Sequence, residues 1–223
     1  DCTDGYTGTL CEQIVDCGSP DAPSSGSVDT GGGTSYGASA DYSCDNGHTL
    51  SGDASSSCGA DGQWSSAAPS CDPVDCGTLD APGSGSVDVP SNIYGATASY
   101  SCDLGHTLGG SASRTCRANG SWSGAAATCD PVDCGTLSAP ESGAVDVGST
   151  LYTGSASYSC DDGHTLVGSA SRSCQSDGSW SGSAPECEPV NCGTPGAPAG
   201  GSVDAPDSTF GSTASYSCDG GAA

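Results

Sequence analysis

The chain has 223 residues, and its composition excludes an ordinary hydrophobic core. Leu, Ile, Val and Phe together number 22, and the formal net charge is −24, with three arginines and no lysine. A strongly charged chain with so few large apolar side chains is expected to be disordered unless cross-links restrain it. Its acidity also excludes nucleic acid and heparin-like polyanions as favoured partners, because like charges repel.

The 16 cysteines supply the missing restraint. Cross-links lower the entropy of the unfolded chain, and so dense an even set of cysteines is typical of an oxidising compartment. We therefore expect a secreted or cell-surface protein. No apolar run approaches the roughly 18 residues of a membrane span. The chain begins without Met or a signal peptide, so we expect it to be a segment of a longer protein.

Residues 1–15 form the first segment of the chain. Here Cys2 and Cys11 frame the sequence Thr-Asp-Gly-Tyr-Thr-Gly-Thr-Leu. This resembles the closing loop of an EGF-like module, whose last two cysteines enclose a Gly-aromatic-x-Gly stretch. The resemblance implies a Cys2–Cys11 disulfide and a C-terminal fragment of such a module.

A tandem repeat follows, and the positions of the cysteines define it. The first cysteine of each copy recurs at nearly equal intervals, at Cys17, Cys76, Cys134 and Cys192. The second, third and fourth cysteines then keep the same spacing in every complete copy: Cys44, Cys58 and Cys71; Cys102, Cys116 and Cys129; and Cys160, Cys174 and Cys187. Such regular spacing indicates a tandem array of small modules.

Each copy carries the same predicted elements in the same order. Alternating stretches such as 38–44 and 96–102 have the two-residue period of strands and are bounded by glycine turns, and no segment shows helical periodicity. An aromatic residue and a glycine precede Tyr-Ser-Cys, and Gly-His-Thr-Leu and Gly-x-Trp follow it. We expect an all-β fold with a small aromatic core formed by Trp64, Trp122, Trp180, Tyr42, Tyr100 and Tyr158.

The four-cysteine frame, Tyr-x-Cys, Gly-x-Trp and the late Pro69-Ser70-Cys71 resemble the sushi module, also called the complement control protein module. The resemblance implies that the first cysteine pairs with the third and the second with the fourth, whereas spacing alone allows three pairings. The implied disulfides are Cys17–Cys58, Cys44–Cys71, Cys76–Cys116, Cys102–Cys129, Cys134–Cys174 and Cys160–Cys187. The implied domains are sushi modules at 16–72, 73–130 and 131–188 and a truncated fourth at 189–223.

Four-residue links such as Asp72-Pro-Val-Asp75 separate the copies. Because proline restricts its own backbone and the residue before it, these links are predicted to be short and stiff. We expect the modules to follow one another end to end as a rod, with the central Val of each link, such as Val132, packed at the module junction.

Candidate sites of chemistry are few. His48, His106 and His164 occur once per copy, and one His with scattered Asp does not make a metal site, so we interpret them as structural rings. Asp-rich turns such as Asp161-Asp162 leave calcium open as a ligand, although no EF-hand loop is present. Catalysis is not expected, because no nucleophile elbow occurs and the carboxylates recur with the repeat.

One glycosylation sequon, Asn119-Gly120-Ser121, lies in a predicted turn, and serine-rich tracts could accept O-linked sugars, so we expect attached glycans. The aromatic residues fall at frame positions in every copy, which favours a scaffold over a receptor with distinct anchors. We expect a non-enzymatic, extracellular structural or adhesive protein, a stiff spacer or filament subunit that contacts other extracellular proteins or copies of itself. Protein recognition of the complement-regulator or receptor type is the alternative.

Overall fold

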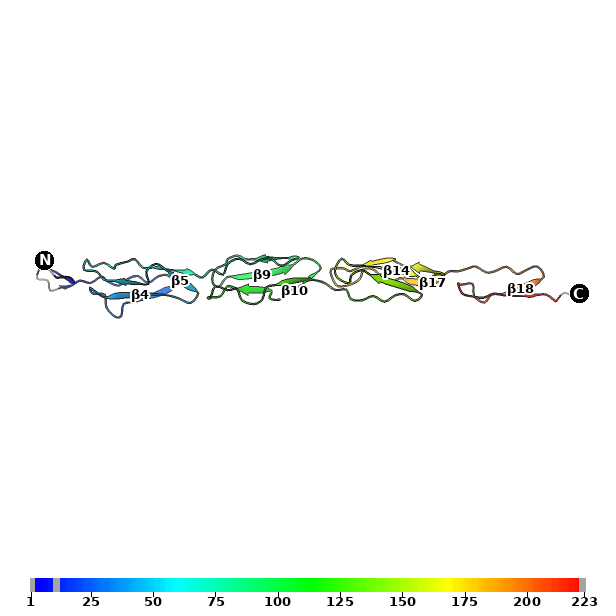
Figure 1. The fold of residues 1–223 in the computed structure, drawn as a ribbon, viewed down its shortest axis with the longest axis horizontal. Coiled ribbons are helices and arrows are strands. Elements are labelled where there is room, and N and C mark those ends of the chain that lie inside the picture. Colours follow the sequence, from blue (N-terminus) through cyan, green and yellow to red (C-terminus); the bar gives the residue numbers. More distant parts are fainter. Residues whose placement is uncertain (1–2, 10–12, 221–223) are drawn as a thin grey trace. The chain divides into compact units, whose positions relative to one another are not determined.

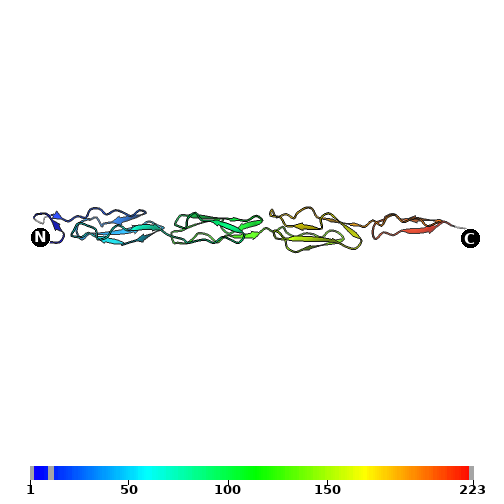
Figure 2. The ribbon, with the colours of Figure 1, turned by 90° about the horizontal axis from the view of Figure 1, so that it is seen from above.

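The computed structural model describes residues 3–9 and 13–220, and within them the fold is all-β, with no helix. These residues form two compact units: residues up to 101 with 108–128, and residues 102–107 with those from 129 onward. Each repeat seen in the sequence is built of short strands joined by long loops (Figures 1 and 2). The fold class is therefore as predicted.

The first segment contains two short strands, β1 (Tyr6–Thr7) and β2 (Gln13–Ile14), which pair antiparallel. The predicted Cys2–Cys11 disulfide lies outside the described residues.

Each complete repeat folds into five strands in two small antiparallel sheets. In the first, β4 lies between β3 and β6, and β5 pairs with β7. The same order recurs in the second and third repeats. The strands are β3 (Gly26–Asp29), β4 (Ser39–Cys44), β5 (His48–Ser51), β6 (Ser55–Ser57), β7 (Ser70–Pro73); β8 (Gly85–Asp88), β9 (Thr97–Cys102), β10 (His106–Gly109), β11 (Ser113–Thr115), β12 (Thr128–Pro131); and β13 (Gly143–Val147), β14 (Ser155–Cys160), β15 (His164–Val167), β16 (Ser171–Ser173), β17 (Glu186–Pro189).

The start of the fourth repeat forms two antiparallel strands, β18 (Gly201–Asp204) and β19 (Ser215–Cys218), in the register of the earlier repeats. Val203 pairs with Tyr216 as Val145 pairs with Tyr158 in the third repeat. The local strand pattern therefore persists here.

The core of each complete repeat lies between its central strand and the loop that carries the tryptophan. Strands β4, β9 and β14 alternate between exposed and buried positions, which places one Ala and one Tyr of each on the core face. In the third repeat, Ala156, Cys174 and Trp180 form a buried cluster, with Leu137 and Val145 packed against it. A disulfide sulfur thus belongs to the hydrophobic core.

Glycine at the start of strands β3 and β13 is explained by the paired strand and the neighbouring disulfide. A Cβ on Gly143 would collide with the Ser159 carbonyl oxygen and approach Cys187 Sγ to 2.8 Å. Only glycine lets the strand pass so close to the cross-link.

Candidate functional site

Six disulfides connect the cysteines of the three complete repeats. They join the first cysteine to the third and the second to the fourth, which is the pairing that the sushi resemblance implied. Their sequence separations of 27 to 41 residues each correspond to about 3–4 kcal/mol in the chain-entropy account of cross-linking. Cys192 and Cys218 of the fourth repeat are free and exposed.

Five of the six predicted core aromatics are buried, and the sixth differs. Tyr42, Tyr100, Tyr158, Trp122 and Trp180 are 6 to 8% exposed. The remaining ring is only partly buried. That ring belongs to Trp64 of the first repeat.

The partial exposure of Trp64 has a cause in the sequence of the first repeat. In the second repeat, Leu79 and Val89 pack against the buried Trp122 cluster. The corresponding positions of the first repeat are Pro20 and Thr30, which offer less apolar cover. A groove of about 470 Å³ lies here, and it is lined by Ser19, Pro20, Asp21, Tyr42, Gln63, Trp64 and residues 66–68.

Each module junction is made by the central valine of the link. Between the second and third repeats, Val132 N–H donates to the Gly105 carbonyl of one module, and the Val132 carbonyl accepts from Tyr152 N–H of the next. The Tyr152 ring lies directly over Gly105, where a Cβ would collide with it. Val132 also faces the turn at Gly178, since a Cβ on that glycine would lie 3.3 Å from Val132 Cγ1.

The same set of contacts occurs at the other junctions. The valine N–H donates to a glycine carbonyl and the valine carbonyl accepts from an aromatic residue's N–H at Gly5–Val15–Tyr36, Gly47–Val74–Tyr94 and Gly163–Val190–Phe210. In each, the aromatic ring covers the glycine. The segment before the first repeat therefore docks through the same contacts as one repeat on another.

The three histidines lie at these junctions. His48, His106 and His164 contact Tyr94, Tyr152 and Phe210 edge to face, with ring centroids 6.0 to 6.1 Å apart. Their rings thus extend the aromatic contact across the junction. Their placement agrees with a structural role rather than with a cluster of ligands.

Carboxylates lie on turns and accept local hydrogen bonds. Ser179 donates its hydroxyl (2.6 Å) and its N–H (2.9 Å) to Asp177, and these bonds lower the pKa of that carboxyl. Hydrogen bonds from Gly135 N–H and Thr150 lower the pKa of Asp133 in the same way. Within residues 3–9 and 13–220, no three His, Cys, Asp or Glu side chains gather as a metal site would require.

The sequon residue Asn119 is exposed in a tight turn. Its amide oxygen accepts hydrogen bonds from Ser121 N–H (3.2 Å) and from the Ser121 hydroxyl (2.7 Å). The corresponding residues of the first and third repeats are Asp61 and Asp177, so the acceptor sequence is specific to the second repeat.

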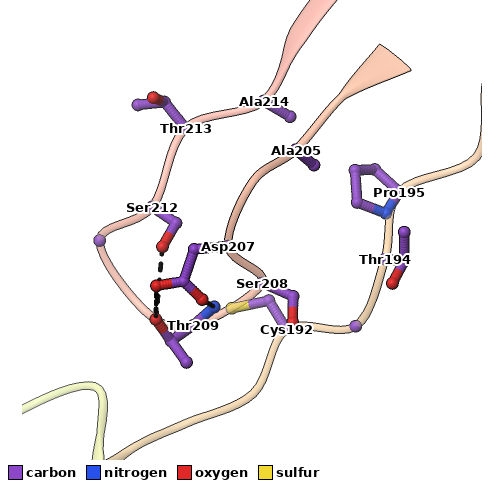
Figure 3. A pocket seen from close by; sticks show the side chains of 12 residues that line it. Cys192, Thr194, Pro195, Ala205, Asp207, Ser208, Thr209, Ser212, Thr213 and Ala214 are labelled. Carbon is purple, nitrogen blue, oxygen red and sulfur yellow. Dashed lines mark hydrogen bonds between the residues drawn. The ribbon is translucent and has the colours of Figure 1, made fainter. Parts of the chain in front are cut away.

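A further pocket lies in the fourth repeat, beside Cys192 (Figure 3). One wall carries Asp207, which accepts hydrogen bonds from the N–H and hydroxyl of Thr209. Pro195 and Ala205 occupy the positions that hold Leu137 and Val147 in the third repeat. Two of its lining residues thus correspond to side chains that pack against the tryptophan cluster of the third repeat.

Tandem disulfide-linked β modules of this kind define an extracellular or cell-surface modular protein. The sequence model of the family described as "Sushi repeat (SCR repeat)" matches residues 17–71, 76–129 and 134–187. The chain therefore belongs to the sushi family. The matches do not include residues 1–15 or 189–223, so the EGF-like and fourth sushi assignments stay predictions. No helix of the described residues is long and apolar enough to cross a membrane.

Relatives include "Sushi, von Willebrand factor type A, EGF and pentraxin domain-containing protein 1" of Mus musculus, 34% identical over 97% of this chain and 6% of that protein. E-selectin of Homo sapiens is 30% identical over 99% of this chain and 39% of its own length. P-selectin of Rattus norvegicus is 30% identical over 99% of this chain and 31% of its length. The chain thus spans between about a twentieth and two fifths of these relatives.

Proposed function

We propose that the chain is a non-enzymatic structural or adhesive spacer, whose stiff junctions set the distance between the parts of an extracellular filament or matrix. The repeated valine, glycine and aromatic contact at four successive junctions is the observation that supports this proposal. A flexible tether would need none of these contacts, since glycine- and serine-rich linkers serve that purpose. Weak lateral contacts would be multiplied along such an array.

The spacer proposal is tested by small-angle X-ray scattering of the full chain. Val132→Asp places a charge between two modules, and we expect the radius of gyration to fall as the junction becomes flexible. Val167→Asp is the matched control, because Val167 is 45% exposed in β15 and takes no part in the junction hydrogen bonds. An unchanged scattering curve for Val132→Asp contradicts the proposal.

Protein recognition through the sushi modules is the second candidate function. The groove beside Trp64 favours it, because this is a module-specific aromatic surface rather than a feature repeated in every copy. The partners would be other extracellular proteins. Neither proposed function relies on calcium.

We also propose that Asn119 carries an N-linked glycan. Its exposed position in a turn supports this assignment. Treatment of protein secreted from eukaryotic cells with an N-glycosidase should lower its mass by one glycan, and Asn119→Asp, which copies the first and third repeats, should abolish the shift. An unglycosylated Asn119 peptide in the mass spectrum would show the assignment to be wrong.

A further inference from the structure

The second and third repeats each use an arginine to fasten the loop that follows the tryptophan. Arg172 donates to the carbonyl oxygens of Ser181 (Nε, 2.8 Å), Trp180 (Nη2, 3.2 Å) and Gly182 (Nη2, 3.0 Å). In the second repeat, Arg114 Nε donates to the Ser123 carbonyl at 2.8 Å. A guanidinium suits this task because its donors form a planar fork.

The first repeat lacks this arginine. The corresponding residue is Ser56, which is 3% exposed and donates to the Ser66 carbonyl at 3.2 Å. Ser66 corresponds to Gly182, so the hydroxyl replaces one of the three bonds that the guanidinium makes in the third repeat. Residues 17–71 contain no Lys or Arg at all.

The groove beside Trp64 lies at the corresponding loop of the first repeat. It is lined by Trp64 and Ser66, the counterparts of two guanidinium acceptors, and by Tyr42. The carboxylate of Asp21 is exposed at its rim. An aromatic surface beside a carboxylate forms an environment that favours a planar cation.

We propose that this groove, defined by Asp21, Tyr42, Trp64 and Ser66, binds an arginine side chain presented by an extended segment of a partner protein. The guanidinium would stack on the partly exposed indole and pair with the Asp21 carboxylate, beside the loop that an internal arginine holds in the other repeats. The proposal rests on the second candidate function, and it adds the chemistry of the partner. Charge complementarity supports it, since eight Asp and no Lys or Arg lie between 16 and 72.

The proposal is tested by titrating the isotopically labelled full chain with a short Gly/Ser peptide that contains one arginine. Chemical shift changes should appear at the Trp64 indole N–H and the Ser66 amide. The same peptide with citrulline, a neutral planar isostere, should bind with an affinity that is lower by about tenfold or more. A lysine peptide should have an intermediate affinity. Equal shifts with arginine and citrulline would overturn the assignment of an arginine ligand.

Variants separate the groove from general attraction to an acidic chain. Asp21→Asn should weaken binding several-fold, whereas Asp80→Asn, the same position of the second repeat, should leave it unchanged. Ser56→Arg supplies the missing internal arginine and should abolish binding. If that variant does not fold, Pro20→Leu, which restores the covering residue of the second repeat, provides the same test.

The outcomes distinguish the two levels of the proposal. Loss of binding in Asp80→Asn to the same degree as in Asp21→Asn contradicts the groove as the site. Binding at Trp64 that does not depend on the peptide's cation contradicts the assignment of an arginine ligand, but it still supports protein recognition at this groove. Absence of any shift at Trp64 contradicts both, whereas the spacer proposal depends only on the scattering experiment.

Discussion

At the scale of single residues, Arg172 shows how a chain with three cations uses them. Its guanidinium donates to three carbonyl oxygens of one loop, and so it replaces apolar packing that the composition does not provide. Hydrogen bonds from charged donors contribute more than neutral ones. Arginine here is a structural residue rather than a surface charge.

Removing this side chain should loosen one loop. We expect Arg172→Ala to lower the free energy of unfolding of the third repeat by about 1–3 kcal/mol, because three hydrogen bonds from a charged group are lost. Hydrogen exchange measured by mass spectrometry should show faster exchange in 173–187. Arg117→Ala is the control, because Arg117 is exposed and bonds to Gly120 and Ser121 through its backbone. Equal effects of the two substitutions would contradict this role.

The turn that contains Asp177 should lose stability in acid. Hydrogen bonds from Ser179 lower the pKa of Asp177, so the folded state favours the ionised carboxylate. The stabilisation is therefore present above the unfolded pKa of about 3.9 and is lost as the pH falls through the lower folded value. A carboxyl-detected NMR titration should give a midpoint below about 3.9 for Asp177. Ser179→Ala should raise that midpoint, whereas Ser157→Ala, an exposed serine of β14, should not.

At the scale of elements, the junction depends on a glycine. Gly105 has a φ of +78°, and a Cβ there would collide with the Tyr152 ring. Its conformation and its close contact both require the absence of a side chain. The turn, the linker and the next module's aromatic residue therefore form one structural element, although Gly105 and Tyr152 lie far apart in the sequence.

The two requirements can be separated by a matched pair of substitutions. Gly135→Ala introduces backbone strain alone, since Gly135 has a φ of +71° and no atom within 4 Å of the added Cβ. Gly105→Ala adds the collision with Tyr152. We expect Gly105→Ala to increase exchange of the Tyr152 and Val132 amides by at least tenfold more than Gly135→Ala does. Similar effects would mean that the ring contact contributes little.

The sequence predicted the elements and the frame better than the surface. Cysteine spacing, alternation in 38–44 and 96–102 and the Gly-x-Trp position were sufficient for the strands and for the aromatic core, because each depends on local pattern and repetition. The partial exposure of Trp64 was not predicted. It depends on Pro20 and Thr30, residues distant in sequence from the indole they fail to cover, and a comparison of copies at these two positions is the signal that could have found it.

The contacts at the module junctions were likewise predicted only in part from the sequence. The valine of each link was expected to pack between modules, and the structure adds that its backbone bonds to both sides. Periodicity gives no information on the Tyr152 ring over Gly105, because the two residues belong to different modules. Contacts between repeats are set by three-dimensional geometry, which a repeat pattern alone does not contain.

At the scale of the whole molecule, stability is divided among modules. Each complete repeat has its own two disulfides and its own core, and the junctions add a few contacts between neighbours. In such an array, the stability is approximately a sum of module terms and nearest-neighbour terms. A single free energy of unfolding therefore does not describe the chain.

Removal of one disulfide should therefore unfold one module. The double substitution Cys134→Ser and Cys174→Ser opens a cross-link of separation 40, worth about 3–4 kcal/mol in a module with a small core. We expect amide protection to be lost across β13, β14 and β16, to weaken in the adjoining junction at Tyr152, and to remain in β3, β4 and β6 of the first repeat. Equal loss in the first and third repeats would show instead that the array unfolds as one cooperative unit, in which damage to any disulfide would remove the spacing function of the whole chain.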